Sequence, residues 1–429
     1  MITKPLVSLA EALRTGELAL NDYLDALEAH VEAREPDVLA LLPEEGRFDR
    51  LRREAQELAE HHPIPATRPP LFGLPVGVKD IIHADGFLTR AGTSVPPERL
   101  RGPQARTVTE LKAAGALVLG KTVTTEFAYF APGPTRNPHH PEHTPGGSSS
   151  GSAAAVGAQI CPVALGTQTI GSVIRPAAFC GVVGYKPSYE RISCEGVIPL
   201  SPSLDHVGFF TTDAAGAAWV APVLVADWQP ATIDRQPVLA VPGGPYLERA
   251  SQEGLAHFRA TCERLAGAGY RLKAVEAMPD FDAIYERHNE LVAVDAAQVH
   301  AGWYAEFGDR YHPKTVELIE RGQSISAGEL SAARAGREKL RAELTALMDQ
   351  HGVDLWLSPP APGAAPRGLD STGDPVMNLP WTHSGLPVVN LPSGTNDAGL
   401  PLGLQVTGRW HADEALLAWA IALERALAD

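Results

Sequence analysis

Three stretches of the chain combine residue types that could carry out nucleophilic catalysis. Two are rich in serine and glycine, Gly146–Ser152 (GGSSSGS) and Gly166–Ser172 (GTQTIGS), and the third, Gly73–Asp80 (GLPVGVKD), contains Lys79. A serine hydroxyl becomes an effective nucleophile when a neighbouring base removes its proton. A buried lysine could be that base, because desolvation lowers its pKa from about 10.4 toward neutrality. Together the stretches indicate a serine nucleophile that needs no histidine.

Each stretch also has a simpler interpretation. Most Gly/Ser runs are flexible linkers, but GGSSSGS leads directly into the helix-forming Ala153–Ala158, which a linker seldom does. A phosphate-binding loop is disfavoured because no GK[ST] follows. The second cluster could be a buried turn before a helix with Pro176 in its first turn, or a loop whose N–H groups bind an oxyanion. Lys79 alone could be an exposed lysine at the end of a strand.

The elements that must position these stretches alternate between short apolar strands and helices from Leu71 onward. A helix is predicted over Thr107–Ala114, and a last helix near Asp413, a candidate N-cap. Strands are predicted at Pro75–Val78, Ala116–Leu119, Val238–Val241, Asp354–Leu357, Val388–Leu391 and Leu402–Val406. Strand–helix alternation of this kind predicts an α/β fold with a covered sheet.

Two parts of the chain interrupt the alternation with helices. Residues 1–70 are predicted to be helical, with a capping box at Ser8–Glu11. Residues of about 280–350 form a second helix-rich block, with another capping box at Ser326–Glu329, and could be a cap over the site or part of an outer helical layer. No linker divides the chain, so residues 1–429 are expected to form one domain.

Composition excludes several classes of function. The 429 residues are 44% hydrophobic and 20% charged, which suits a globular protein with a large core. The net charge of −15 argues against a nucleic-acid or anionic-membrane partner. Neither a signal-peptide core nor a membrane-spanning apolar run is found. The cysteines lack CxxC spacing and are expected to be reduced thiols in a cytoplasmic protein: Cys161, Cys180, Cys194 and Cys262.

Beyond these patterns, the chain resembles the amidase signature family. The resemblance rests on GLPVGVKD, GGSSSGSAAAV and GTQTIGSVIRPAAFCGVVGYKPS, which occur here in the family's order. It continues through Lys121–Phe127, Asn137–Pro138, Leu204–Gly208 and Gly385–Gly408, and it covers most of residues 5–428, most weakly over about 225–350. It implies a single large α/β domain with a mixed, mostly covered sheet surrounded by helices.

The resemblance also implies a catalytic triad. Lys79 matches the base, Ser172 the nucleophile, and Ser148 the bridging serine, whose peptide bond is expected to be cis. The serine forms an acyl-enzyme that water then cleaves, and neither a metal nor an organic cofactor is required. The oxyanion is expected to be held by the backbone N–H groups of Thr169, Ile170, Gly171 and Ser172.

Around the nucleophile the chain departs from the common family form, GTDTGGS-I-R-x-P. Gln168 stands in place of the aspartate and Ile170 in place of a glycine, while Arg175 lies one position later than usual. Ile170 preserves the oxyanion N–H geometry only if its φ suits a β-branched residue. These changes are interpreted as a subfamily variant in which the bracing of the loop is rearranged.

Two further groups of residues are weaker candidates. His139, His140 and His143 lie in a Pro-rich loop without carboxylate ligand spacing, so a solvated loop is expected rather than a metal site. The substrate pocket is expected to include parts of about 280–350 and the segment Gly373–Trp381. Its candidate lining residues, which could equally be core or surface residues, are Asn378, Trp381 and His383.

The resulting hypothesis is a soluble cytoplasmic amidase that hydrolyses the C–N bond of a small carboxamide or urea-type substrate and could be a homodimer. One alternative is the ammonia-releasing A subunit of a tRNA-dependent amidotransferase, which would act in an obligate complex. The acidic charge and a length slightly short for the family weigh against this alternative. A second alternative is a catalytically inactive binding homologue, suggested by Gln168 and Ile170.

Overall fold

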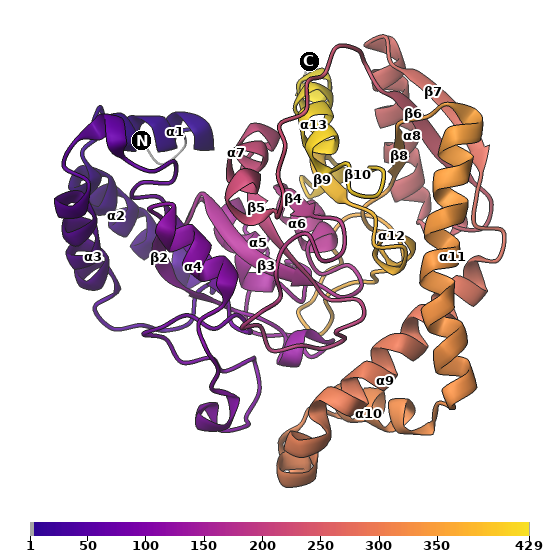
Figure 1. Ribbon diagram of the computed structural model, residues 1–429, viewed down its shortest axis with the longest axis horizontal. Helices are drawn as coiled ribbons and strands as arrows, with labels where there is room; N and C mark the ends of the chain where they lie inside the picture. The colour runs from indigo at the N-terminus through magenta and orange to yellow at the C-terminus, as the bar shows by residue number, and fades with distance from the viewer. Residues whose placement is uncertain (1–3, 429) are drawn as a thin grey trace.

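A ten-stranded sheet runs through the computed structural model, which describes residues 4–428 (Figure 1). The strands are β1 (Pro75–Lys79), β2 (Leu117–Thr122), β3 (Val163–Gln168), β4 (Val183–Lys186), β5 (His206–Thr211), β6 (Val238–Gly243), β7 (Arg271–Glu276), β8 (Leu355–Ser358), β9 (Val388–Thr395) and β10 (Pro401–Thr407). Their order across the sheet is β2-β1-β3-β5-β4-β9-β10-β8-β6-β7.

The two ends of the sheet are parallel and its middle is antiparallel. Strand β1 pairs in parallel with β2 and β3, and β6 pairs in parallel with β7 and β8. Every pair between β3 and β8 is antiparallel. The sheet is therefore mixed, as the family resemblance implies. All six strands predicted from the sequence are present, and β3, β4, β5 and β7 are additional.

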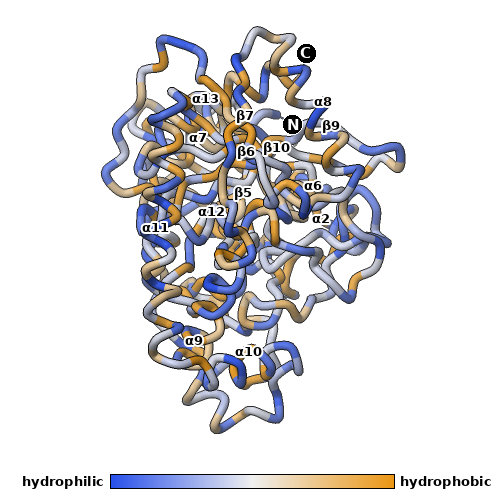
Figure 2. The backbone as a smooth tube through the Cα atoms, turned by 90° about the vertical axis from the view of Figure 1, so that its right-hand side faces the viewer, coloured by the Kyte–Doolittle hydropathy of each residue, from blue (hydrophilic) through white to orange (hydrophobic). Residues whose placement is uncertain are grey.

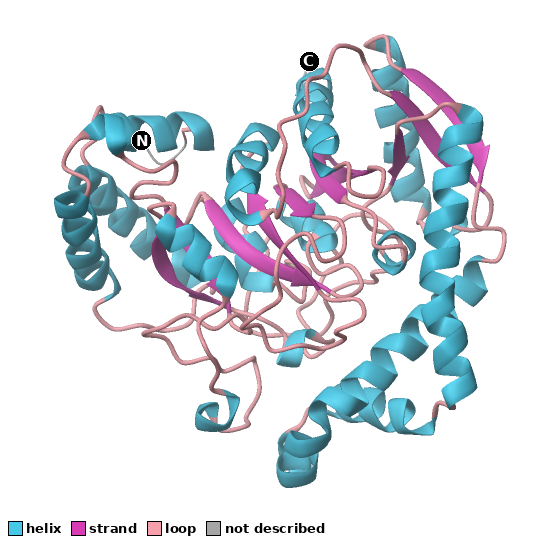
Figure 3. Ribbon diagram, viewed as in Figure 1, coloured by secondary structure: helices cyan, strands magenta, loops and turns pink. Residues whose placement is uncertain are grey.

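Helices surround this sheet (Figure 3). They are α1 (Leu6–Thr15), α2 (Leu20–Val38), α3 (Arg47–His61), α4 (Arg106–Ala113), α5 (Ser150–Gly157), α6 (Ile174–Cys180), α7 (Ala214–Leu224), α8 (Gln252–Gly267), α9 (Phe281–Phe307), α10 (Pro313–Ser324), α11 (Ala327–His351), α12 (Leu379–His383) and α13 (Asp413–Ala428). Every residue of β1, β2 and β3 is buried, as expected for parallel strands covered on both faces. Hydrophobic segments concentrate where these elements pack (Figure 2).

The N-terminal helices confirm the prediction of a helical start, but one of its details is wrong. Helix α1 begins at Leu6 after Pro5, so Ser8 lies inside the helix and makes no cap. The second capping box is confirmed: Ser326 Oγ accepts a hydrogen bond from Glu329 N, and the Glu329 carboxylate accepts one from Ser326 N at 2.8 Å. Helix α13 begins at Asp413, whose carboxylate binds Tyr185 and Ser188.

The helix-rich block predicted over about 280–350 consists of α9, α10 and α11 (Figure 1). Its contacts with the rest of the molecule include short polar bonds. Asp295 of α9 accepts a hydrogen bond from Ser201 Oγ at 2.7 Å, and Arg341 of α11 donates to the Ser384 carbonyl at 2.9 Å. None of the helices within residues 4–428 is long and apolar enough to cross a membrane.

Candidate active site

Lys79 is the last residue of β1, between β2 and β3, and its side chain is fully buried. Its Nζ donates hydrogen bonds to Ser148 Oγ and to Thr167 Oγ1, both at 2.7 Å. Burial lowers the pKa of Lys79 well below its ordinary value, while the charge of Asp205 opposes this shift. The site therefore favours a neutral amine, which can accept a proton from a hydroxyl group.

Ser148 lies in the loop before α5, and the peptide bond between Gly147 and Ser148 is cis, as the resemblance implies. Neighbouring chain segments hold the loop. The Ser148 carbonyl accepts a hydrogen bond from Thr125 N at 3.2 Å. A side chain at Gly147 would place its Cβ 2.6 Å from Thr372 Cγ2, so the loop packs closely against the segment before α12.

Ser172 lies between β3 and α6 and is 8% exposed. Within residues 4–428 its hydroxyl makes no hydrogen bond, so Lys79 and Ser148 are directly joined while Ser148 and Ser172 are not. Catalytic hydrogen bonds are often long before substrate binds and shorten in the complex. The structure thus brings the predicted base and bridging serine into contact and leaves the predicted nucleophile free to approach a ligand.

Gln168 braces the loop that carries Ser172. Its Oε1 accepts hydrogen bonds from Val173 N and Ile174 N at 2.8 and 2.9 Å. Its Nε2 donates to Thr382 Oγ1 at 2.9 Å, and this hydroxyl donates in turn to the Ile170 carbonyl at 2.6 Å. An amide can accept and donate at once, whereas an ionised aspartate can only accept. This network supports the interpretation of a rearranged brace.

Arg175 and Ile170 also fit their positions. Arg175 is buried and donates from Nη2 to the Gly147 carbonyl at 2.8 Å and to Thr372 Oγ1 at 3.1 Å. Burial lowers the pKa of Arg175 to about 10. The guanidinium thus ties the cis-peptide loop to the segment before α12. The φ angle of Ile170 lies outside the left-handed region, so a β-branched residue fits where the family has glycine.

Asp205 is a buried carboxylate beside the same loop that the sequence did not identify as a site residue. Its Oδ1 accepts a hydrogen bond from Thr169 Oγ1 at 2.5 Å, and its Oδ2 accepts from Leu200 N and Ser201 N. Burial raises the pKa of Asp205 to about 6. The available signal was a lone aspartate in the mainly apolar segment LDHVGFF, a setting in which a buried carboxylate needs partners.

The loop that contains Thr169 and Ile170 lines two cavities. The first, named here the Ile170 cavity, has a volume of about 300 Å³. Its walls come from that loop, α9, α10 and the segment before α12, and they include Phe130, Ile170, Tyr285, Lys314, Thr372 and Leu379. Residues of the helix-rich block and of Gly373–Trp381 therefore do line a cavity next to the predicted oxyanion site.

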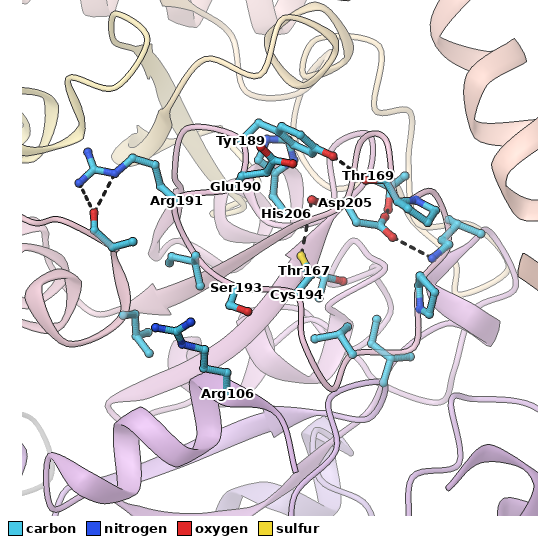
Figure 4. Close-up of a pocket in the computed structure, with 18 of the residues that line it drawn as sticks. Arg106, Thr167, Thr169, Tyr189, Glu190, Arg191, Ser193, Cys194, Asp205 and His206 are labelled. Atoms are coloured by element: carbon cyan, nitrogen blue, oxygen red, sulfur yellow. Dashed lines mark hydrogen bonds between the residues drawn. The ribbon is translucent and has the colours of Figure 1, made fainter. Parts of the chain in front are cut away.

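The second cavity, named here the Thr167 cavity, has a volume of about 630 Å³. Figure 4 shows Thr167 close to Cys194, with Asp205 and Thr169 next to each other above them and Arg106 farther away, at the bottom of the view. Thr167 connects this cavity to the base, because its hydroxyl is the second partner of Lys79 Nζ. Residues of the loop before Ser172 therefore line two cavities of different size, Thr167 and Thr169 the larger and Ile170 the smaller.

The three predicted pocket residues belong to the buried core. Asn378 donates to the Pro360 carbonyl and to Gln405 Oε1, both at 2.8 Å. Trp381 Nε1 donates to the Tyr246 hydroxyl at 2.9 Å. His383 is buried with its ring centroid 5.5 Å from that of His288.

The histidine-containing loop forms contacts with backbone carbonyl groups. His139 Nε2 lies 2.9 Å from the Cys180 carbonyl, and His143 Nδ1 lies 2.8 Å from that of Ala365. In the described part of the chain, no group of three or more histidine, cysteine, aspartate and glutamate side chains could hold a metal ion. The four cysteines are free thiols.

The chain is similar to proteins of one known family. Residues 44–417 match the family model described as Amidase. The chain is 33% identical to the A subunit of the glutamyl-tRNA(Gln) amidotransferase from Synechococcus sp. (strain WH7803), over 97% of this chain and 96% of the relative. The protein of the same name from Geobacter metallireducens is 30% identical to this chain, over 98% of this chain and 96% of that protein. The chain therefore belongs to the amidase signature family, whose hydrolases use a serine nucleophile.

Solved structures lead to the same family. The chain is similar to a crystal structure of an amidase, with 33% sequence identity and a TM-score of 0.89. The match covers 98% of this chain and 99% of the amidase chain. The native peptide amidase from Stenotrophomonas maltophilia, 25% identical, covers 99% and 96% with a TM-score of 0.82. The α/β fold with a mixed sheet is thus the amidase signature fold.

Proposed function

We propose that this protein hydrolyses the C–N bond of a small carboxamide or urea-type substrate through a seryl acyl-enzyme. Ser172 is the nucleophile, Ser148 the bridging serine and Lys79 the base. The observation that carries this proposal is the fully buried Lys79, whose Nζ lies 2.7 Å from Ser148 Oγ. A lysine with hydroxyl partners and a lowered pKa is a competent base.

The proposed reaction has two halves. Lys79 accepts the proton of Ser148 as Ser148 accepts that of Ser172, and Ser172 Oγ bonds to the carbonyl carbon. The oxyanion is held by the backbone N–H groups of Thr169, Ile170, Gly171 and Ser172. The same route returns the proton to the nitrogen as the C–N bond breaks and the amine leaves. Water then attacks the ester by the same base catalysis and releases the acid.

The Ile170 cavity supports a small acyl group. Its volume of about 300 Å³ lies at the lower end of the range for small-molecule sites. Its walls combine apolar side chains such as Phe130 and Leu379 with the polar Lys314 and Thr372. A short acyl group with a polar end fits this lining.

The test is an assay of Ser172→Ala and Lys79→Ala against a panel of small amides and ureas, with release of the amine or ammonia measured. Both variants are expected to lose at least about 10³-fold in kcat, because triad members act as a unit. Ser324→Ala, at an exposed serine on α10, is the matched control and should retain wild-type turnover. Full turnover in either triad variant would overturn the proposal.

The amidotransferase alternative is favoured by one observation: relatives that carry that name are 30–33% identical over most of the chain. It predicts that the purified single chain is inactive on the amide panel and releases ammonia from glutamine only with a partner. The acidic charge of −15 supports the single-chain amidase instead.

The inactive-homologue alternative predicts that Ser172 does not react. A fluorophosphonate probe that labels wild-type protein but not Ser172→Ala would exclude it. We also propose a cytoplasmic location, supported by the four free cysteines.

A further inference from the structure

Ile170 belongs both to the loop proposed to hold the oxyanion and to the wall of the cavity proposed for the acyl group. The common family form has glycine at this position, which leaves that part of the wall without a side chain. The proposed reaction uses only the backbone N–H group of Ile170. Its side chain, which is 6% exposed, has no role in that reaction.

We propose that Ile170 is a specificity-determining residue whose side chain selects acyl groups without a branch at the α-carbon, the carbon next to the carbonyl group. Amides with one or two methyl groups on that carbon are disfavoured because those groups overlap with the Ile170 side chain. The inference rests on the proposed amidase function and narrows its substrate class to amides of straight-chain acids.

Covalent geometry places the side chain of Ile170 beside the oxyanion that its own N–H group is proposed to hold. A bound oxyanion lies about 2.9 Å from the backbone nitrogen, and the Cβ atom lies about 2.5 Å from the same nitrogen. The oxyanion and Cβ are therefore at most about 5.4 Å apart. The α-carbon of the substrate is two bonds from the oxyanion. Because Ile170 also lines the cavity proposed for the acyl group, substituents on that carbon meet its side chain.

The loop that carries Ile170 is held from behind, so the side chain has little room to retreat. The Ile170 carbonyl accepts a hydrogen bond from Thr382 Oγ1 at 2.6 Å. A Cβ at Gly171 would lie 2.3 Å from Asn378 Oδ1 and 2.9 Å from Pro375 Cβ, so the loop packs directly against α12 and the segment before it. The β-branched side chain is itself restricted in rotation about χ1. A bulky group therefore overlaps with Ile170 rather than displacing it.

Beyond Ile170 the cavity has space for the remainder of an acyl chain. Its volume is about 300 Å³, and its walls include the apolar side chains of Phe130 and Leu379. Tyr285, which lines the cavity from α9, is 37% exposed, so part of the cavity is open to solvent. The site is therefore expected to discriminate more strongly against branching next to the carbonyl group than against chain length.

The test compares butanamide, 2-methylbutanamide and 2,2-dimethylbutanamide, which share one chain length and differ in branching at the α-carbon. Wild-type kcat/KM should fall about tenfold or more with the first methyl group and further with the second, a typical effect of one carbon that a pocket does not accommodate. Ile170→Gly should reduce the preference for butanamide over 2-methylbutanamide to about threefold or less. Ile170→Ala, which keeps a Cβ atom, should give an intermediate preference.

Ile160→Ala, at a fully buried isoleucine outside both cavities, is the matched control. It removes the same atoms from the core and should leave the preference unchanged. The 4-nitrophenyl esters of the same three acids provide a second measurement, in which the burst of 4-nitrophenol reports acylation of Ser172. The change in preference from wild type to Ile170→Gly should be the same for esters and amides, because the intrinsic reactivity of each substrate cancels in that comparison.

Two results would count against the inference: equal kcat/KM for straight and branched substrates in wild type, or a preference that Ile170→Gly leaves unchanged. Each of these leaves the amidase proposal standing, provided that the reaction depends on Ser172. If neither the amides nor the esters react, or if the reaction persists in Ser172→Ala, the proposed function fails and this inference fails with it.

Discussion

Two buried lysines on neighbouring parallel strands have different partners. Lys79 ends β1 against the hydroxyl groups of Ser148 and Thr167. Lys121, on β2, lies 3.0 Å from the carboxylate of Asp80 and donates to the Ile82 carbonyl at 2.8 Å. Burial lowers the pKa of both lysines, but at Lys121 the adjacent carboxylate opposes the shift through direct contact.

The comparison indicates that the partners of a buried lysine, and not burial alone, determine what chemistry it can carry out. A carboxylate in contact stabilises the ammonium form and forms a structural ion pair. Hydroxyl partners stabilise the charge less and can themselves give up a proton to the amine. Lys79 is thus suited to proton transfer and Lys121 to stability, and the following experiments test that division.

The largest expected effect is on catalysis at Lys79. Lys79→Met should lower kcat by about 10³-fold or more, since it removes the only titratable side chain bonded to Ser148 among the described residues. Lys79→Arg should not restore activity, because a guanidinium stays protonated and cannot act as a base. Steady-state assays on the best substrate provide the measurement. If kcat of Lys79→Arg is within tenfold of the wild-type value, the site requires a positive charge at this position and not proton transfer.

The next effect is on stability at Lys121. Lys121→Met leaves the carboxylate of Asp80 buried without its cation and should lower the free energy of unfolding by about 3–5 kcal/mol. Urea denaturation measures this change, and the folded variant should keep nearly wild-type kcat. The double variant Asp80→Asn/Lys121→Met should recover part of the loss. If Lys121→Met has wild-type stability but has lost activity, Lys121 has a catalytic role and does not differ from Lys79 in the proposed way.

The lowered pKa of Lys79 predicts a pH dependence. Because the neutral amine is the proposed base, kcat/KM should rise about tenfold per pH unit up to that lowered pKa and then level off. Between the lowered pKa of the folded protein and about 10.4, Lys79 is protonated in the unfolded chain but neutral in the folded one. Its contribution to the free energy of unfolding therefore increases with pH over that range. Lys79→Met should abolish the stability slope assigned to this group. If the variant keeps the same dependence of unfolding free energy on pH, a group other than Lys79 causes it.

The smallest effect concerns the brace behind the oxyanion loop. Thr382→Val removes the hydroxyl that links Gln168 to the Ile170 carbonyl and should lower kcat by about three- to tenfold through slight misplacement of the N–H groups. Thr382→Ser keeps the hydroxyl and should stay close to wild type. If the serine variant loses as much as the valine variant, packing rather than the hydrogen bond positions the loop.

The sequence predicts the candidate site residues better than the residues that hold them in position. Lys79, Ser148 and Ser172 are found from motifs, and their roles remain proposals. The hydroxyl of Thr382 lies 214 residues from Gln168, and no local pattern shows that the two meet. Asp205 was missed for the same reason, since its partner Thr169 is 36 residues away.

Local patterns also misplaced some elements. The Ser8–Glu11 box had the correct residue types, but the N-cap is Pro5, three residues before Ser8, which leaves the box inside the helix. Strands β3 and β5 were not predicted: every residue in them is buried, so they show no alternation of apolar and polar residues, and glycine and polar residues shorten their apolar runs.

The residues of the proposed relay all lie within 73–176, whereas most walls of the Ile170 cavity come from α9, α10 and residues 371–379. The residues proposed for the proton route and most walls of the Ile170 cavity are thus encoded in separate parts of the gene. If that cavity selects the acyl group, drift in the later part changes which molecules are accepted while the proposed proton route is inherited intact. Exchange of the α9–α10 region between relatives is therefore a rational way to redirect the enzyme to new substrates.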